Sequence, residues 1–211
     1  MTRMRNISRI LVAAAVALAG TSCGDVVRTG RAPVFLVIDS LAAAKGDDEE
    51  KFFSFLLSDV ITNVTTPDPC KPDNPCPTVF NDPGQATLRL TPKDIGPVGA
   101  ATVPSANNEV TINRVHIKYR RADGRNVPGV DVPYEIDSAA TATVPSSGTV
   151  TMGFQLVRHT SKEEAPLVQL KTNGVIIATI AEVTLYGRDR VGNDINATGT
   201  IEVDFGNFGD K

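Results

Sequence analysis

The stretch that decides the fold is residues 195–205, which read INATGTIEVDF. Apolar or small residues stand at every second position from Ile195 to Phe205, and polar residues fill the places between them. Successive side chains of a β-strand point to opposite faces, so a period of two predicts a strand with one buried face. A helix would repeat its apolar positions every three or four residues, and this stretch does not.

Similar short runs recur along the chain and predict about seven strands. They lie at residues 33–40, 52–61, 86–91, 110–121, 149–158, 175–188 and 195–206. Two long loops rich in proline and other turn residues, 65–84 and 92–108, lie between some of them. Seven short strands separated by turn signals are typical of a Greek-key β-sandwich, so the predicted fold class is all-β.

The apolar alternation changes phase inside two of the predicted strands, between Ile112 and Val115 and between Ile180 and Val183. A β-bulge inserts one residue into a strand and shifts its phase by one. The predicted bulges are at residues 113–114 and 181–182. The segment 127–136 contains two prolines and is interpreted as a broken edge strand.

The segment 52–61 holds three of the eight phenylalanines, Phe52, Phe53 and Phe55. Phe53, Phe55 and Leu57 alternate as in a strand, which predicts that this segment packs on the core. The alternative is an exposed apolar patch that docks another molecule. The acidic run just before it, 47–50, is interpreted as a solvated loop or the start of a helix.

The chain begins with the features of an export signal. Three arginines lie within the first nine residues, an unbroken apolar run covers 10–19, and small residues precede Cys23. This order is typical of a secretory signal, and the apolar run is too short to cross a bilayer. No second apolar run of spanning length follows, so no transmembrane segment is expected.

The segment 18–23, LAGTSC, resembles a bacterial lipoprotein signal, in which the chain is cut before a cysteine that carries diacylglycerol. The resemblance implies that residues 1–22 are removed and that Cys23 is lipidated. Gly20 departs from the family, which usually has Leu or a similar residue there. The alternative is an ordinary secretory cleavage site at 17–19, ALA, which would leave Cys23 as a free thiol.

The cysteine count agrees with lipidation. There are three cysteines, and acylation of Cys23 would leave Cys70 and Cys76. In an oxidising compartment these two are expected to form a disulfide that staples the proline-rich loop. Their spacing does not match a C-x-x-C redox motif, and a zinc site would need more ligands.

The predicted organisation is a removed signal peptide at 1–22, a membrane tether at 23–32 and a β-sandwich at 33–207 with the disulfide loop 65–84. Two small β domains divided near residue 105 are the alternative. The net charge is −3, and loss of three arginines with the signal makes it about −6. An acidic chain argues against a nucleic-acid binder that relies on a broad basic face.

The C-terminal segment 182–205 resembles the last hairpin of bacterial immunoglobulin-like domains. It contains Asp189, a tight turn with Gly192 and Asn193, and then the threonine-rich alternation. Gly and Asn tolerate the positive φ of such turns, and Asp189 can accept bonds from the turn's N–H groups. The resemblance implies an immunoglobulin-like sandwich, although the chain has no tryptophan and no inter-sheet cysteine pair.

No motif for catalysis or for a cofactor occurs. There is no P-loop, no G-x-G-x-x-G, no H-E-x-x-H and no G-x-S-x-G elbow. The two histidines, His116 and His159, are interpreted as surface residues, and no metal site or cofactor is predicted. A hydrolase with a serine or two acids gathered beside one of these histidines is the remaining enzymatic alternative.

Two sets of residues are candidates for ligand binding. The first is the basic strand with Arg114, Lys118, Arg120 and Arg121, which is either a charged sheet edge or a patch for an anionic polysaccharide or an acidic partner. Tyr119 and Tyr134 could stack on sugar beside it. The second is the turn with Asp189 and Asp194, which could bind calcium with other loop oxygens.

The sequence therefore predicts a non-enzymatic protein that is exported and held in the bacterial cell envelope by a lipid on Cys23. Its sandwich is expected to serve as a structural or protein-interaction module with an envelope protein as partner. The alternative is a carbohydrate- or calcium-binding module at the cell surface that uses loops 65–84 and 188–195.

Overall fold

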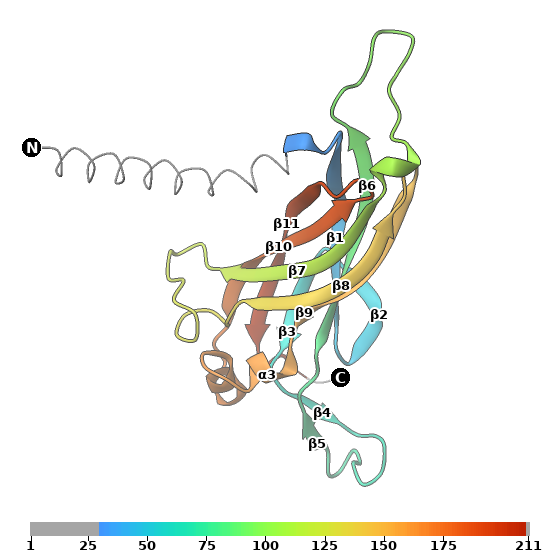
Figure 1. Cartoon of the computed structure of the whole chain (residues 1–211). Coiled ribbons are helices and arrows are strands. Elements are labelled where there is room, and N and C mark those ends of the chain that lie inside the picture. The colour runs from blue at the N-terminus through green and yellow to red at the C-terminus, as the bar shows by residue number, and fades with distance from the viewer. Residues whose placement is uncertain (1–29, 210–211) are drawn as a thin grey trace, which may run out of the picture.

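The computed structural model describes residues 30–209, which form two β-sheets packed face to face (Figure 1). The predicted signal peptide 1–22, Cys23 and most of the tether lie outside the described residues. The four-stranded sheet has the order β2 (Asp48–Phe53), β1 (Val34–Lys45), β6 (Asp82–Pro92) and β9 (Thr149–Val157). The five-stranded sheet has the order β3 (Phe55–Asp59), β11 (Asp194–Gly206), β10 (Ile177–Asp189), β7 (Val110–Arg120) and β8 (Ile136–Val144).

Neighbouring strands are antiparallel except for β3, which pairs in parallel with β11. The prediction of an all-β chain built as a sandwich is confirmed. The prediction of about seven strands is wrong, because the described chain has eleven. The two sheets include β2 and β8, which the alternation did not indicate.

The remaining elements are short. The hairpin of β4 (Thr62–Val64) and β5 (Cys76–Thr78) projects from one end of the sandwich, and a disulfide between Cys70 and Cys76 closes its loop (Figure 1). The helices are η1 (Ala106–Asn108), α3 (His159–Lys162) and η2 (Leu167–Thr172). Within residues 30–209, no helix is long and apolar enough to cross a membrane.

The last strand behaves as its sequence predicts. In β11, Ile195, Ile201, Val203 and Phe205 are buried, and the alternate positions are less buried or exposed. One hydrophobic core contains residues from both sheets and from both sides of residue 105. The two sheets are also joined by Tyr119 of β7, which is buried. Its hydroxyl donates a hydrogen bond to the Leu156 carbonyl of β9.

One predicted bulge is confirmed and the other is wrong. The register of β7 with both of its neighbours shifts at Asn113, which returns Val115 to the core face. In β10 the pairing with β11 is continuous, and the inward residues are Ile177, Thr179 and Ala181. Ile180 is exposed, so the predicted bulge at 181–182 does not exist.

The segment 127–136 is not an edge strand. Its residues up to 135 form turns, which Val130, Asp131 and Val132 stabilise by donating backbone hydrogen bonds to the Val127 carbonyl. The strand begins only at Ile136, and this strand, β8, forms one edge of the five-stranded sheet. Its residues are mostly small, which is why no apolar alternation marked it.

Candidate functional site

An apolar pocket lies where the chain crosses from one sheet to the other. β2 is the edge of the four-stranded sheet, β3 is the edge of the five-stranded sheet, and Ser54 alone separates them. The predicted single strand 52–61 is therefore two strands with a break at Ser54. The crossing closes one side of the sandwich and leaves a cavity of about 410 Å³ beside it, here called the corner pocket.

Aromatic side chains form part of the corner pocket. Phe53 and Phe55 line it with their ring centroids 6.1 Å apart, and they are 53% and 47% exposed. Ala43, Leu56 and Leu57 add apolar surface behind them. The segment 52–61 does pack on the core, through Leu56 and Val60, but its three phenylalanines are exposed, as the alternative of an exposed apolar patch expects.

Charged groups of both signs surround this apolar lining. Asp48 and Lys51 form an ion pair of 2.6 Å, and the ammonium of Lys45 lies 5.7 Å from the centroid of the Phe208 ring. Asp59 accepts hydrogen bonds from the backbone of Ile61 and of Phe208. An apolar hollow with a mixed charged rim has the composition of a protein-docking site, in which an aromatic or aliphatic side chain of the partner fills the hollow.

A buried polar cluster contacts β3 through Ser58. Asp82 and Lys162 are each 1% exposed, and the Lys162 ammonium lies 2.8 Å from the Asp82 carboxylate. The same carboxylate accepts the Ser58 hydroxyl at 2.6 Å and the Gly46 N–H at 3.0 Å. Burial raises the pKa of the Asp82 carboxyl, and the Lys162 ammonium opposes the rise.

This cluster joins four parts of the chain that lie far apart in sequence. Ser58 is in β3, Asp82 begins β6, Lys162 ends α3, and Gly46 is in the turn between β1 and β2. Lysine and aspartate are rarely buried without a partner. Because each of these two charges needs the other, the elements that carry them are held together beside the corner pocket. Sequence reasoning missed it, because no local pattern links the four residues.

The basic strand is placed inside the five-stranded sheet. β7 lies between β10 and β8, so the interpretation of this strand as a sheet edge is wrong. Each predicted basic residue has an acidic partner. The pairs are Arg114 with Asp137 at 2.6 Å, Lys118 with Glu135 at 2.8 Å, Arg120 with Glu182 at 3.1 Å and Arg121 with Asp123 at 2.7 Å. Arg114 also lies 4.6 Å from the ring centroid of Tyr186.

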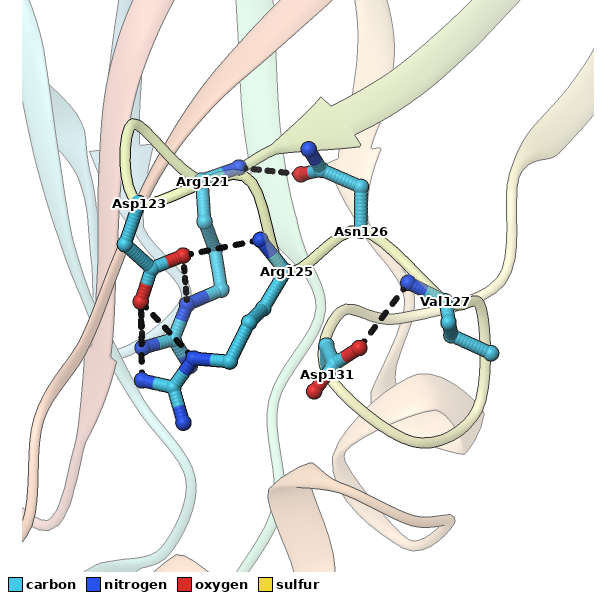
Figure 2. Close-up of polar contacts among 6 residues, drawn as sticks. All are labelled: Arg121, Asp123, Arg125, Asn126, Val127 and Asp131. Carbon is cyan, nitrogen blue, oxygen red and sulfur yellow. Dashed lines mark hydrogen bonds and ion pairs between the residues drawn. The ribbon is translucent and has the colours of Figure 1, made fainter.

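Figure 2 shows the end of this charged row, in the loop after β7. The Asp123 carboxylate lies between the guanidinium groups of Arg121 and Arg125, at 2.7 and 2.8 Å. Their hydrogen bonds hold the pKa of Asp123 well below its ordinary value. Asn126 accepts the Arg121 N–H, and Asp131 accepts the Val127 N–H, so the loop's polar groups are occupied by one another (Figure 2).

His116 does lie beside two acids, as the hydrolase alternative required. Its ring nitrogens are 3.4 Å from Glu135 and from Asp137. Hydrogen bonds from Lys118 and Arg114 lower the pKa of these two carboxyls. A general acid in hydrolysis needs a raised pKa, so the lowered pKa of these two carboxyls does not suit that role. The ring of His159 lies 3.0 Å from the side-chain oxygen of Asn81.

The turn between β10 and β11 uses its acids internally. Asp189 accepts the N–H groups of Val191 and Asn193 at 3.0 and 2.8 Å, as predicted for a turn-capping residue. Asp194 accepts a bond from Arg188. Among residues 30–209, no three His, Cys, Asp or Glu side chains gather in a way that could hold a metal ion.

Of the two tyrosines expected to stack on sugar, Tyr119 is in the core and is closed to any ligand. Tyr134 is exposed and covers Gly129 in the loop after β7. No protein-family model matches this chain, and no curated protein matches it in sequence.

Proposed function

We propose that this protein is a non-enzymatic lipoprotein of the bacterial cell envelope, whose sandwich binds an envelope protein through the corner pocket. The observation that carries the proposal is the pair Phe53 and Phe55, exposed beside an apolar cavity on a chain with an export signal. Exposed aromatic side chains beside a hollow are costly in water and mark interaction sites on soluble domains.

The cysteines support the lipid anchor. Cys70 and Cys76 are bonded to each other, so Cys23 is the one cysteine of the three without a disulfide partner in the sandwich. Cys23 also follows the basic leader, the apolar run and the small residues that a lipoprotein signal requires. Lipidation would use this thiol and attach the chain to the membrane at its N-terminal end.

The strand order supports an immunoglobulin-like module. Strands β1, β6 and β9 would take the places of A, B and E, and β11, β10, β7 and β8 those of G, F, C and C′. The chain crosses between sheets from β6 to β7 and from β9 to β10, as a Greek key does from B to C and from E to F. Such modules serve commonly as interaction domains.

The rim of the pocket indicates the chemistry of the partner. Phe53 and Phe55 provide flat apolar surface for one large apolar side chain, and the Asp48–Lys51 pair and Lys45 provide polar contacts around it. An interface with an apolar centre and a polar rim places most of its binding free energy in the central side chains. The partner is therefore a protein segment with an exposed aromatic or aliphatic residue flanked by charges.

Site-specific photo-crosslinking in the producing cell tests this proposal. A photoreactive phenylalanine analogue at position 55 should give one adduct of defined mass, and the same analogue at Tyr134, an equally exposed aromatic position, should not. Phe53→Ser should abolish the adduct formed from position 55 while leaving the fold intact. Failure to form any adduct from position 55, or equal adducts from 55 and 134, would contradict the docking role.

A further inference from the structure

A long loop of the sandwich lies at the end where the described chain begins (Figure 1). This loop, residues 93–109, connects β6 to β7, and its first backbone N–H, that of Lys93, donates to the Pro33 carbonyl at 2.9 Å. The bond ties the base of the loop to the start of β1. The loop therefore stands beside the segment that leads back to Cys23.

The loop presents apolar side chains without any charge. No charged residue occurs from Ile95 to Asn108. Val98 is fully exposed, and Ile95 and Val103 are 75% and 76% exposed. A hydrogen bond from the Thr102 N–H to the Ile95 carbonyl, at 3.1 Å, joins the two arms of the loop and holds Val98 at its tip. Three exposed apolar side chains on one uncharged stretch of loop are unusual on a soluble domain and indicate a contact with another apolar surface.

Two other connections lie at the same end. The turn after β10 exposes Val191, and Arg190 of this turn is paired with Glu109 at the base of the long loop. The connection from β8 to β9, residues 145–148, is PSSG and is uncharged. The register places them together, because Val110 pairs with both Asp189 and Val144.

A run of four acidic residues lies at the opposite end. β1 runs away from Pro33, so the acidic run of residues 47–50 lies at its far end, by the corner pocket. The end that bears the long loop has charges of both signs at its base, with Arg31 and Lys93 beside Asp94 and with Glu109 paired to Arg190. An exposed apolar tip with charged groups only at its base suits the surface of a membrane.

We propose that the loop tip, residues 95–104, lies in the lipid surface and forms a second membrane contact next to the acyl anchor. This inference rests on the proposed lipid anchor at Cys23. Ten residues from Cys23 to Pro33 reach about 35 Å when fully extended, so the anchor keeps this end near the bilayer. The contact would orient the sandwich, with the corner pocket facing away from the membrane and toward a partner.

A fluorescence experiment tests the inference on the full acylated protein. Val98→Cys would be the one reactive thiol, since Cys23 would carry lipid and Cys70 is bonded to Cys76. An environment-sensitive fluorophore on this thiol is measured in vesicles of phosphatidylethanolamine and phosphatidylglycerol, with and without bromine on the acyl chains. Val130→Cys, an exposed valine at the opposite end, is the matched control, and the intact mass of each sample reports whether Cys23 is acylated.

The inference predicts that brominated chains remove most of the emission from position 98 and none from position 130. Unquenched emission at 98 in a protein with acylated Cys23 would overturn the inference and leave the anchor standing. A blue-shifted emission at 98 without bromine quenching would also overturn it, because the loop would then be covered by protein, such as a second copy. An unmodified Cys23 in protein taken from membranes would overturn the proposed anchor itself.

Discussion

The hydroxyl of Tyr119 donates a hydrogen bond to the backbone carbonyl of Leu156, and this bond connects the two sheets through the core. Tyr119 belongs to β7 and Leu156 to β9, and both residues are buried. The ring of Tyr119 also meets Phe205 of β11 edge-on, with centroids 5.5 Å apart. Burial raises the pKa of Tyr119, which favours the protonated hydroxyl that donates this bond.

Removing this hydroxyl should weaken the sandwich without changing its shape. Tyr119→Phe leaves the Leu156 carbonyl without its donor, which costs about 1–3 kcal/mol for a buried group. Urea unfolding followed by circular dichroism would measure the loss. Tyr134→Phe removes the same atom from an exposed ring and should leave the unfolding midpoint unchanged, so equal losses in the two variants would contradict the account.

The buried ion pair predicts a larger effect. Lys162→Met leaves Asp82 buried without its counter-charge, which should reduce the free energy of unfolding by about 3–5 kcal/mol. The additional change Asp82→Leu removes the stranded carboxylate and should recover part of that loss. A double variant as unstable as Lys162→Met would show that the charge on Asp82 is not the cause. Thermal unfolding of the three proteins provides the comparison.

Gly187, near the end of β10, predicts a steric effect. A Cβ at this position would lie 2.6 Å from the backbone oxygen of Thr111, which cannot move without disturbing β7. Gly187→Ala should therefore destabilise the fold by about 1–3 kcal/mol. In Gly153→Ala the new Cβ has its nearest neighbour at 3.9 Å, so the change should be within about 0.5 kcal/mol. Chemical denaturation of both variants decides whether the close approach matters.

The outer face of the five-stranded sheet predicts a pH dependence. Two hydrogen bonds from Arg114 lower the pKa of the Asp137 carboxyl. Because the folded pKa is below the unfolded value of about 3.9, the pair stabilises the fold above that pH. Its contribution is lost as the pH falls through the folded pKa. Carboxyl titration by NMR should place the Asp137 midpoint below its ordinary value, and Arg114→Met should raise it. An unchanged midpoint in that variant would argue that Arg114 is not the cause.

The elements that the sequence predicts best are those with one clearly buried face and a local turn signal. β11 alternates along its length, the slip in β7 corresponds to a real bulge at Asn113, and Asp189 caps the turn between β10 and β11. Each of these features depends on residues within a few positions of one another. Local sequence therefore contains the information that specifies them.

The features that the sequence did not predict depend on distant contacts. In β10 the inward side includes Thr179, whose buried hydroxyl donates a hydrogen bond to the Val203 carbonyl. Because threonine is polar, the apolar alternation assigned this position to the outer face. The segment 52–61 was expected to pack on the core as one strand, but the chain breaks at Ser54 to cross between the sheets, and Phe53 and Phe55 are exposed there. The cluster of Ser58, Asp82 and Lys162 forms only when three separate elements meet.

The central claim is that the mature protein is held in the envelope by a lipid on Cys23. Mass spectrometry of the protein purified from cell membranes in mild detergent tests it most directly. The account predicts a chain that begins at Cys23 and has the added mass of a diacylglyceryl group on that residue, and predicts that Cys23→Ala appears in the soluble fraction. A chain that begins elsewhere, an unmodified Cys23, or a Cys23→Ala protein that remains in the membrane would contradict it.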